Sequence, residues 1–310
     1  MDLSIVIPLY NEEESLAELV DWIKKSIGDQ GWTYEIIMVD DGSTDTSWSK
    51  VVSLKKAHSE IKGIKFRRNY GKSAALNEAF DAAQGNVVVT MDADLQDSPE
   101  EIPELFRMIT DQDYDLVSGW KKERHDPVSK TIPTKLYNWA TRMMSGIKLN
   151  DMNCGLKAYK HEVVKSIEVY GEMHRYIPVL AKTQGFDKIG EKVVQHQARK
   201  YGVTKFGLNR FSRGLLDLMT ITFMGRFGKR PMHFFGSTGM VFTFIGTILL
   251  TILTIQKVIY KVGGIASRPM FFLGMLLVIV GIQLFIAGFL AEMISRNNPK
   301  RNDYSISETI

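Results

Sequence analysis

Short apolar runs and amphipathic stretches alternate along the first part of the chain. The apolar runs are "LSIVIPL" (3–9), "YEIIMVD" (34–40), "IKGIKFR" (61–67) and "NVVVTMD" (86–92). A stretch with helical spacing follows each of the first three, at residues 13–27, 43–58 and 72–85. This alternation predicts βαβ units and a largely parallel sheet. Because the strands are almost continuously apolar, we expect helices on both faces of the sheet.

Two long apolar segments lie near the carboxyl end of the chain. No residue from 231 to 256, or from 269 to 291, carries a formal charge. A helix needs roughly 20 apolar residues to cross a bilayer core of about 30 Å, so each segment is long enough. A buried hairpin of a soluble protein is the alternative, but soluble helices of this length usually have a polar face. The pattern therefore predicts two transmembrane helices.

Basic residues near these segments predict the orientation of the chain in the membrane. Three lie in the loop between the segments and six lie outside it: Lys257, Lys261 and Arg268 in the loop, and Arg226, Lys229, Arg230, Arg296, Lys300 and Arg301 outside. Because basic residues near membrane helices favour the cytoplasmic side, we expect both termini there. Residues 206–230 combine apolar helical spacing with basic residues, which predicts an amphipathic helix on the membrane surface. A helix packed within the protein is the alternative.

The composition is that of a folded protein. Charged residues make up 24% and apolar residues 45% of the 310 positions, which is typical of globular chains. The formal charge of +4 is too small to indicate a general nucleic-acid binder. Cys154 is the single cysteine, so an intrachain disulfide and a cysteine metal cluster are excluded. The apolar run at the N-terminus is too short, and its flank too acidic, for a signal peptide.

Carboxylates gather where the predicted strands end. The first strand leads into "PLYNEEE", the second into "VDDGSTD" and the fourth into "MDADLQDSPEE". Ligands of open parallel sheets bind at the carboxyl ends of strands, so we expect one composite site. In the last motif Ser98, Pro99 and Glu101 are typical of a helix start with a capping box. A negative charge at Asp97 is favourable just before such a helix, so these residues need no ligand.

The other polar residues of that motif are typical metal ligands. Asp92, Asp94 and Gln96 project to one side if the strand continues extended, because side chains alternate along a strand. Their oxygens suit Mg²⁺ or Mn²⁺, which usually takes further ligands from substrate phosphates. The chain has no G-x-x-x-x-G-K-[ST], which excludes a P-loop enzyme, and no G-x-G-x-x-G after its first strand, which argues against a dinucleotide fold. We therefore expect a metal-bound di- or triphosphate substrate.

Six ordered segments carry a family resemblance. They are "SIVIPLYNEEESL", "IIMVDDGSTDTS", "RRNYGKSAALNEAF", "MDADLQDSPEEI", "MNCGLKAYK" and "HQARKYGVTKF", within about residues 3 to 230. The chain resembles glycosyltransferase family 2, and more narrowly its polyprenyl-phosphate branch, the type of dolichol-phosphate mannose synthase and bacterial GtrB. The resemblance implies a GT-A fold, which is an α/β, Rossmann-like domain with a mainly parallel sheet. It also implies a nucleotide-sugar donor and a divalent metal, Mg²⁺ or Mn²⁺.

The resemblance assigns roles to individual residues. Asp94 and Gln96 would hold the metal against the diphosphate. Arg199 and Lys205 would contact donor or acceptor phosphates, with Lys205 on the nucleotide-sugar side and Arg199 acting in catalysis beside Asp94. The remaining nucleotide-sugar site would be formed by Pro8, Tyr10, Asn11, Glu12, Asp41 and Asp92.

Two positions depart from the family pattern. Thr204 stands where a serine usually precedes the lysine, and it keeps the hydroxyl group. Trp120 stands where an arginine usually follows the strand at 115–119. Lys121, Lys122 or Arg124 would then supply the charge that meets the acceptor phosphate.

Three further residues have competing interpretations. Asp151 in "NDMNCG" would contact the sugar, or act as a catalytic base in relatives with hydroxyl acceptors. A loop-capping role for Asp151 is the alternative. Cys154 is interpreted as a packing residue, since no activating partner is evident. His196 is interpreted as structural or phosphate-contacting, because no second histidine lies at ligand spacing.

The sequence therefore predicts an inverting glycosyltransferase of the inner (plasma) membrane. It would move a sugar from a UDP- or GDP-linked donor to a polyprenyl phosphate, undecaprenyl phosphate, at the cytoplasmic face. An anionic phosphate acceptor needs no strong catalytic base. A glycan hydroxyl as acceptor, or an inactive membrane-anchored binding module, is the alternative. The resemblance implies a homo-oligomer, a tetramer, and no nucleic-acid partner is expected.

The expected domains follow from these segments. Residues 1–205 would form the GT-A domain and residues 206–230 the amphipathic juxtamembrane segment. Residues 231–294 would form the transmembrane hairpin, and residues 295–310 a cytoplasmic tail.

Overall fold

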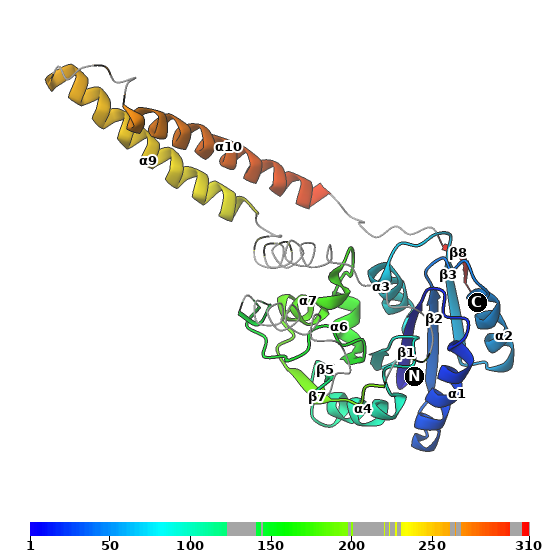
Figure 1. Ribbon diagram of the computed structural model, residues 1–310. Helices are drawn as coiled ribbons and strands as arrows, with labels where there is room; N and C mark the ends of the chain where they lie inside the picture. The colour runs from blue at the N-terminus through cyan, green and yellow to red at the C-terminus, as the bar shows by residue number, and fades with distance from the viewer. Residues whose placement is uncertain are drawn as a thin grey trace. The chain divides into compact units, whose positions relative to one another are not determined.

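The computed structural model describes residues 1–122, 141–143, 145–197, 200, 220, 223, 227, 231–260, 264, 268–297 and 306–309. The chain divides into two compact units. The first comprises Met1–Thr222 with Asn302–Ile310 and is an α/β domain, and the second, Phe223–Arg301, is a helical hairpin (Figure 1). Most of the predicted amphipathic segment 206–230 lies outside the described residues.

An eight-stranded sheet forms the centre of the first unit, in the order β7-β5-β6-β4-β1-β2-β3-β8. Its first four strands in sequence run parallel: β1 (Leu3–Leu9), β2 (Tyr34–Asp40), β3 (Ile61–Phe66) and β4 (Val87–Thr90). The remaining strands are β5 (Leu116–Trp120), β6 (Lys157–Lys160), β7 (Ile189–Val193) and β8 (Ile306–Thr309). β6 is antiparallel to both β4 and β5, and β8 is antiparallel to β3. The prediction of a mainly parallel α/β sheet is confirmed.

Helices cover both faces of this sheet, as the apolar strands predict (Figure 1). One face packs against α1 (Leu16–Ile27), α2 (Ser47–Ala57) and α4 (Ile102–Thr110). The other packs against α3 (Lys72–Ala82), α6 (His161–Ser166) and α7 (Ile177–Thr183). The described part of this unit also contains three short 3₁₀ helices, η1 (Gly28–Gln30), η2 (Pro99–Glu101) and η3 (Met173–Arg175). Strands β1 to β6 each supply side chains to both cores, because successive side chains point to opposite faces.

Two long helices, α9 (Pro231–Tyr260) and α10 (Pro269–Asn297), form the second unit. Their most apolar windows have mean hydropathies of 2.0 and 2.6, and only 17% and 11% of those windows are buried. The core helix of a soluble protein would be mostly buried, so these values favour helices that cross a membrane.

Glycines allow the two helices of the hairpin to pack closely. A Cβ on Gly239 would lie 2.5 Å from the carbonyl oxygen of Gly281, and one on Gly246 would lie 2.8 Å from that of Gly274. Small residues at such positions let membrane helices approach backbone to backbone. The large apolar side chains, such as Phe244 and Ile294, are exposed on the outside of the hairpin.

Candidate active site

The loops after β1 and β2 are joined by hydrogen bonds. Asn11 has a left-handed backbone (φ 57°), its N–H donates to Ser43 Oγ at 2.9 Å, and its Oδ1 accepts from Thr44 N at 2.9 Å. The N–H of Glu12 donates to Ser47 Oγ at 2.9 Å. Since β4, β1 and β2 are parallel neighbours, their carboxyl ends meet at one edge. The structure thus brings the loop that holds the predicted residues Asn11 and Glu12 beside the loop that follows Asp41.

Asp41 holds the start of α3 rather than facing solvent. Its carboxylate accepts the backbone N–H groups of Tyr70 at 2.7 Å and Gly71 at 2.9 Å. Burial raises the pKa of Asp41, and these two hydrogen bonds oppose that rise. Lys72 follows directly, so Asp41 fixes the backbone that presents this lysine to the site. The nucleotide contact expected of Asp41 stays a prediction.

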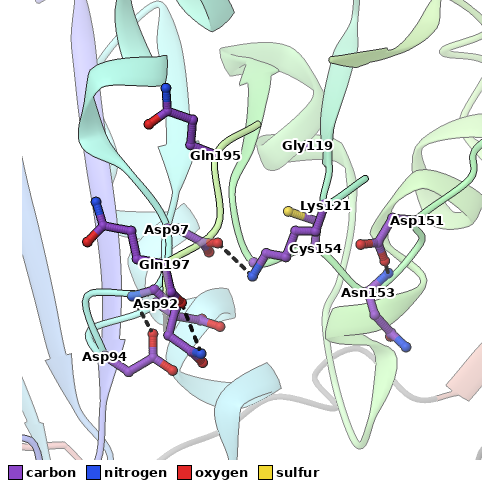
Figure 2. Close-up of polar contacts among 12 residues, drawn as sticks. Asp92, Asp94, Asp97, Gly119, Lys121, Asp151, Asn153, Cys154, Gln195 and Gln197 are labelled. Atoms are coloured by element: carbon purple, nitrogen blue, oxygen red, sulfur yellow. Dashed lines mark hydrogen bonds and ion pairs between the residues drawn. The ribbon is translucent and has the colours of Figure 1, made fainter. Parts of the chain in front are cut away.

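The chain after β4 turns, so the condition under which Asp92, Asp94 and Gln96 would project to one side, an extended strand, is not met. β4 ends at Thr90, Leu95 has a left-handed backbone (φ 61°), and the N–H of Gln96 donates to Asp94 Oδ1 at 3.2 Å. The strand does not continue because a residue with positive φ redirects the chain. Asp92 and Asp94 consequently have different surroundings (Figure 2).

Asp92 forms an ion pair with Lys72, the first residue of α3. Burial would raise the pKa of Asp92, but Lys72 outweighs it, with help from Lys121 and His174, and lowers that pKa to about 2. A Cβ on Gly155 would lie 2.6 Å from Asp92 Oδ2, so glycine makes room for the carboxylate. Asp92 is therefore ionised and held in place.

Asp97 belongs to the interior of the site, which the sequence analysis missed. It is 1% exposed, and its Oδ1 lies 2.6 Å from Lys121 Nζ (Figure 2). Burial alone would lower the pKa of Lys121, but Asp97 raises it above the ordinary value, so this lysine stays charged. Lys121 was expected to contact the acceptor phosphate. Because its charge is already paired with Asp97, that contact stays a prediction.

The predicted helix start after Asp97 is present, but its capping box is incomplete. Ser98 Oγ accepts from Glu100 N at 3.3 Å, and Pro99 is the first residue of η2. The Glu101 side chain pairs instead with Lys192 and accepts from Gln195 N at 3.0 Å. Glu101 thereby fixes the chain that follows β7 beside the site.

His196 and Gln197, which follow β7, lie against Gln96 and Asp97. Gln197 N donates to the Gln96 carbonyl oxygen at 2.9 Å, Gln96 Nε2 lies 3.5 Å from the Gln197 carbonyl oxygen, and His196 forms a β-bridge with Asp97. His196 is therefore placed by its backbone, in line with the structural alternative. The predicted phosphate contacts Arg199, Lys205 and Arg124 lie outside the described residues. Lys122 is exposed, with its Nζ 5.9 Å from the centre of the Trp120 ring.

Asp151 and Cys154 lie in the loop before β6. Asp151 is 1% exposed, its Oδ1 accepts from Asn153 N at 3.1 Å, and its own N–H donates to Glu191 Oε1 at 2.9 Å. This geometry is that of the loop-capping alternative, and a sugar contact for Asp151 stays a prediction. Burial raises the pKa of Cys154 to about 12, so it stays a thiol that packs, as expected.

Two basic residues that the sequence analysis did not single out also line this region. Lys157 in β6 is 3% exposed, and Arg175 ends η3. Together with Lys72, Asp92 and Asn153 they line a pocket. Lys157 could have been noticed, because in "LKAYK" it shares the inward face with Tyr159. Arg175 had no comparable signal.

The residues present fit a divalent cation that is shared with a substrate. Asp94 supplies a carboxylate and Gln96 an amide oxygen, both hard ligands suited to Mg²⁺ or Mn²⁺. In the described part of the chain, no group of three or more His, Cys, Asp and Glu side chains is arranged to hold a metal. This small donor set suits a cation that takes its other ligands from a diphosphate.

Comparisons with known proteins agree with this geometry. A family model described as glycosyl transferase family 2 matches residues 4–167. The chain is 36% identical over 302 residues to dodecaprenyl-phosphate galacturonate synthase of Rhizobium johnstonii, covering 96% of this chain and 88% of that protein. It is 32% identical over 295 residues to undecaprenyl-phosphate 4-deoxy-4-formamido-L-arabinose transferase of Pseudomonas syringae, covering 95% and 86%.

Solved structures resemble the α/β domain at the level of the fold. Glucosyl-3-phosphoglycerate synthase from Mycobacterium tuberculosis superposes with a TM-score of 0.54 at 22% identity, covering 72% of this chain and 79% of that one. Another structure of that enzyme, which contains Mn²⁺, UDP and glucosyl-3-phosphoglycerate, also gives a TM-score of 0.54. The second structure likewise covers 72% of this chain and 79% of its own chain.

Proposed function

The chain belongs to glycosyl transferase family 2, and we propose that it transfers a sugar from a UDP- or GDP-linked donor to a polyprenyl phosphate. One observation carries this proposal. The similarity to dodecaprenyl-phosphate galacturonate synthase covers 96% of the chain, so it extends beyond the α/β domain into the apolar hairpin. A polyprenyl acceptor is a membrane lipid, and a hairpin of this kind would keep the enzyme beside it.

The chemistry of the transfer is a displacement at the anomeric carbon of the sugar. An oxygen of the acceptor phosphate forms the new bond to this carbon, the bond to the donor diphosphate breaks, and a nucleoside diphosphate leaves. The acceptor is already anionic at neutral pH, so the step requires no strong base. Direct displacement inverts the anomeric configuration. The main requirement is stabilisation of negative charge on the leaving diphosphate.

A divalent cation would meet this requirement together with basic residues of the chain. Asp94 and Gln96 would hold Mg²⁺ or Mn²⁺, which supplies positive charge to the diphosphate. Asp92, held by Lys72, would lie on the nucleoside side with Pro8. Arg199 and Lys205 would contact phosphates from the segment that follows Gln197.

The hairpin and its flanking basic residues support a location in the inner membrane. We propose that α9 and α10 span it, with the α/β domain and both termini in the cytoplasm, because more basic residues flank the hairpin than lie in its loop. A homo-oligomer is part of the proposal, and its size can be measured by light scattering in detergent.

A donor panel tests the proposal. Purified enzyme in detergent is incubated with undecaprenyl phosphate, Mg²⁺ or Mn²⁺, and labelled UDP-glucose, UDP-N-acetylglucosamine, GDP-mannose, UDP-galactose or UDP-galacturonic acid. The last is included because one relative is a galacturonate synthase. The expected result is a labelled product in the chloroform phase with at least one donor. Label found only on a glycan would support the hydroxyl-acceptor alternative and contradict the proposal.

A further inference from the structure

The pocket beside Asp92 carries more positive than negative charge. Its charged lining residues are three cations, Lys72, Lys157 and Arg175, and one carboxylate, Asp92. Asp92 is already paired with Lys72. Pro8 and Asp92 also line the pocket, so it adjoins the ends of β1 and β4, where the donor is expected. Lys157 and Arg175 therefore have no carboxylate partner among the pocket's own lining residues, at a position next to the expected substrates.

Of these two cations, Lys157 is the one without an ion-pair partner among the described residues. Its side chain is buried, and its Nζ donates to the carbonyl oxygen of Cys154. Within the described residues, no carboxylate lies within ion-pair distance of its Nζ. A buried ammonium group without an anion is unfavourable, and burial accordingly lowers the pKa of Lys157. An anionic ligand in the pocket would remove this cost.

Arg175 is suited to bind an anion in the same pocket. Its side chain is 11% exposed, and its Nη2 lies 3.0 Å from Glu172 Oε2. The Glu172 side chain is 47% exposed, so water screens this ion pair. A guanidinium group has five N–H donors in a planar fork that matches the oxygens of a carboxylate or a phosphate. Among the described residues, Glu172 is the one ion-pair partner of Arg175, so N–H donors are left for a ligand.

We infer that Lys157 and Arg175 form a subsite that binds an oxyanion of one of the substrates. This oxyanion is a group that the divalent cation does not hold. The inference rests on the proposed function, since the substrates of that reaction offer two such groups. One is the carboxylate of an acidic donor sugar, and the other is the phosphate of the lipid acceptor. The carboxylate and the phosphate each offer two oxygens, which an arginine can bind in a bidentate manner.

Two matched ligand pairs test the subsite and distinguish the sources. UDP-galacturonic acid and UDP-galactose differ in a carboxylate, and farnesyl phosphate and farnesol differ in a phosphate. Binding to the full-length protein in detergent is measured by calorimetry in the presence of EDTA, so that no divalent cation contributes. For Arg175→Met we expect about tenfold weaker binding of the charged member of one pair. The neutral member of that pair should bind as it does to the wild type.

Control variants separate a lost charge from a damaged fold. Arg175→Lys keeps a positive charge and should keep most of the affinity. Arg107, an exposed arginine that bonds to Gln30 outside the pocket, provides the matched control Arg107→Met, which should leave binding unchanged. Lys157→Met is a second test if its thermal melting matches the wild type.

Two results would overturn the inference. One is unchanged binding of both charged ligands to Arg175→Met. The other is an equal loss for a charged ligand and its neutral counterpart, which would indicate a structural role. These measurements need no turnover. A wild-type enzyme that makes no lipid-linked sugar would contradict the proposed function and leave the binding comparison valid.

Discussion

Asp92 and Asp94 lie two positions apart and have different neighbours, which gives them different expected roles. Asp92 is paired with Lys72, and its pKa is about 2. Asp94 closes a turn by accepting the N–H of Gln96. The ion pair of Asp92 already neutralises its charge, so we assign the metal to Asp94 and Gln96.

Asp94→Ala is expected to lower the transfer rate at least about 100-fold, because the charge of the leaving diphosphate loses its stabilising cation. Melting should stay close to the wild type, since the carboxylate bonds within its own turn. Initial rates over a range of Mn²⁺ concentrations measure the effect. Asp29→Ala, at an exposed position in η1, is the control and should be fully active. Full activity of Asp94→Ala in EDTA would contradict the metal role.

Lys121→Met is expected to destabilise the protein by about 3 kcal/mol or more, because it leaves the buried Asp97 carboxylate without its partner. The double variant Lys121→Met/Asp97→Asn removes both charges and should recover most of that stability. Thermal melting of the three proteins measures this. Activity separates the two roles of Lys121: a stable but inactive double variant would support the acceptor-phosphate contact. A stable and active one would show that the ion pair is structural.

Glu35 gives the stability a dependence on pH. Burial would raise its pKa, but Lys62 Nζ at 2.7 Å, Ser4 Oγ at 2.5 Å and Gln84 N at 2.8 Å outweigh burial and lower it. A carboxyl group with a lowered folded pKa stabilises the fold above its unfolded pKa, about 4.3 for glutamate. This stabilisation is lost as the pH falls through the folded pKa.

Lys62→Met should therefore cost about 1–2 kcal/mol at pH 7, since Lys62 is partly exposed and its charge is screened. The difference from the wild type should shrink below about pH 4. Chemical denaturation over a pH series measures it. A difference that stays constant down to pH 3 would show that the lost stability does not come from the charge of Glu35.

At the scale of elements, the strands and the first helices could be predicted from the sequence because their patterns are local. Short and almost continuous apolar runs, and amphipathic stretches with period 3.6, identified β1 to β4 and α1 to α3. The turn at Leu95 could not be predicted, since a leucine with positive φ has no local signal. The Asp97–Lys121 pair joins segments on either side of α4, and only the folded chain brings them together.

Loops place the site residues, and Gly155 shows how closely they are packed. Gly155→Ala would put a methyl group 2.6 Å from Asp92 Oδ2, which a shift of the carboxylate away from Lys72 can relieve. We expect stability near the wild type and a rate lower by about 10- to 100-fold, because small displacements of aligned groups are costly. Gly28→Ala, where an added Cβ meets nothing within 4 Å, is the matched control. Equal rates for both variants would contradict the placement of Asp92 in the site.

At the scale of the whole molecule, an α/β domain with polar strand ends is joined to an apolar hairpin. The two long apolar helices followed from the sequence because each is a continuous apolar run. The composite site was inferred from the polar ends of three separate strands, and it stays a prediction. The short C-terminal strand β8 could not be predicted, because four residues in a polar tail are too few to show a hydrophobic pattern. The predicted domain boundaries stay predictions.

In the proposed reaction the sugar alone, without a phosphate, moves to the lipid phosphate. Mass spectrometry of the lipid product, together with chromatography of the released nucleotide, tests it most directly. We expect a lipid with one phosphate between polyprenol and sugar, and an equal amount of released nucleoside diphosphate. A lipid-linked diphosphate sugar with release of nucleoside monophosphate would contradict it.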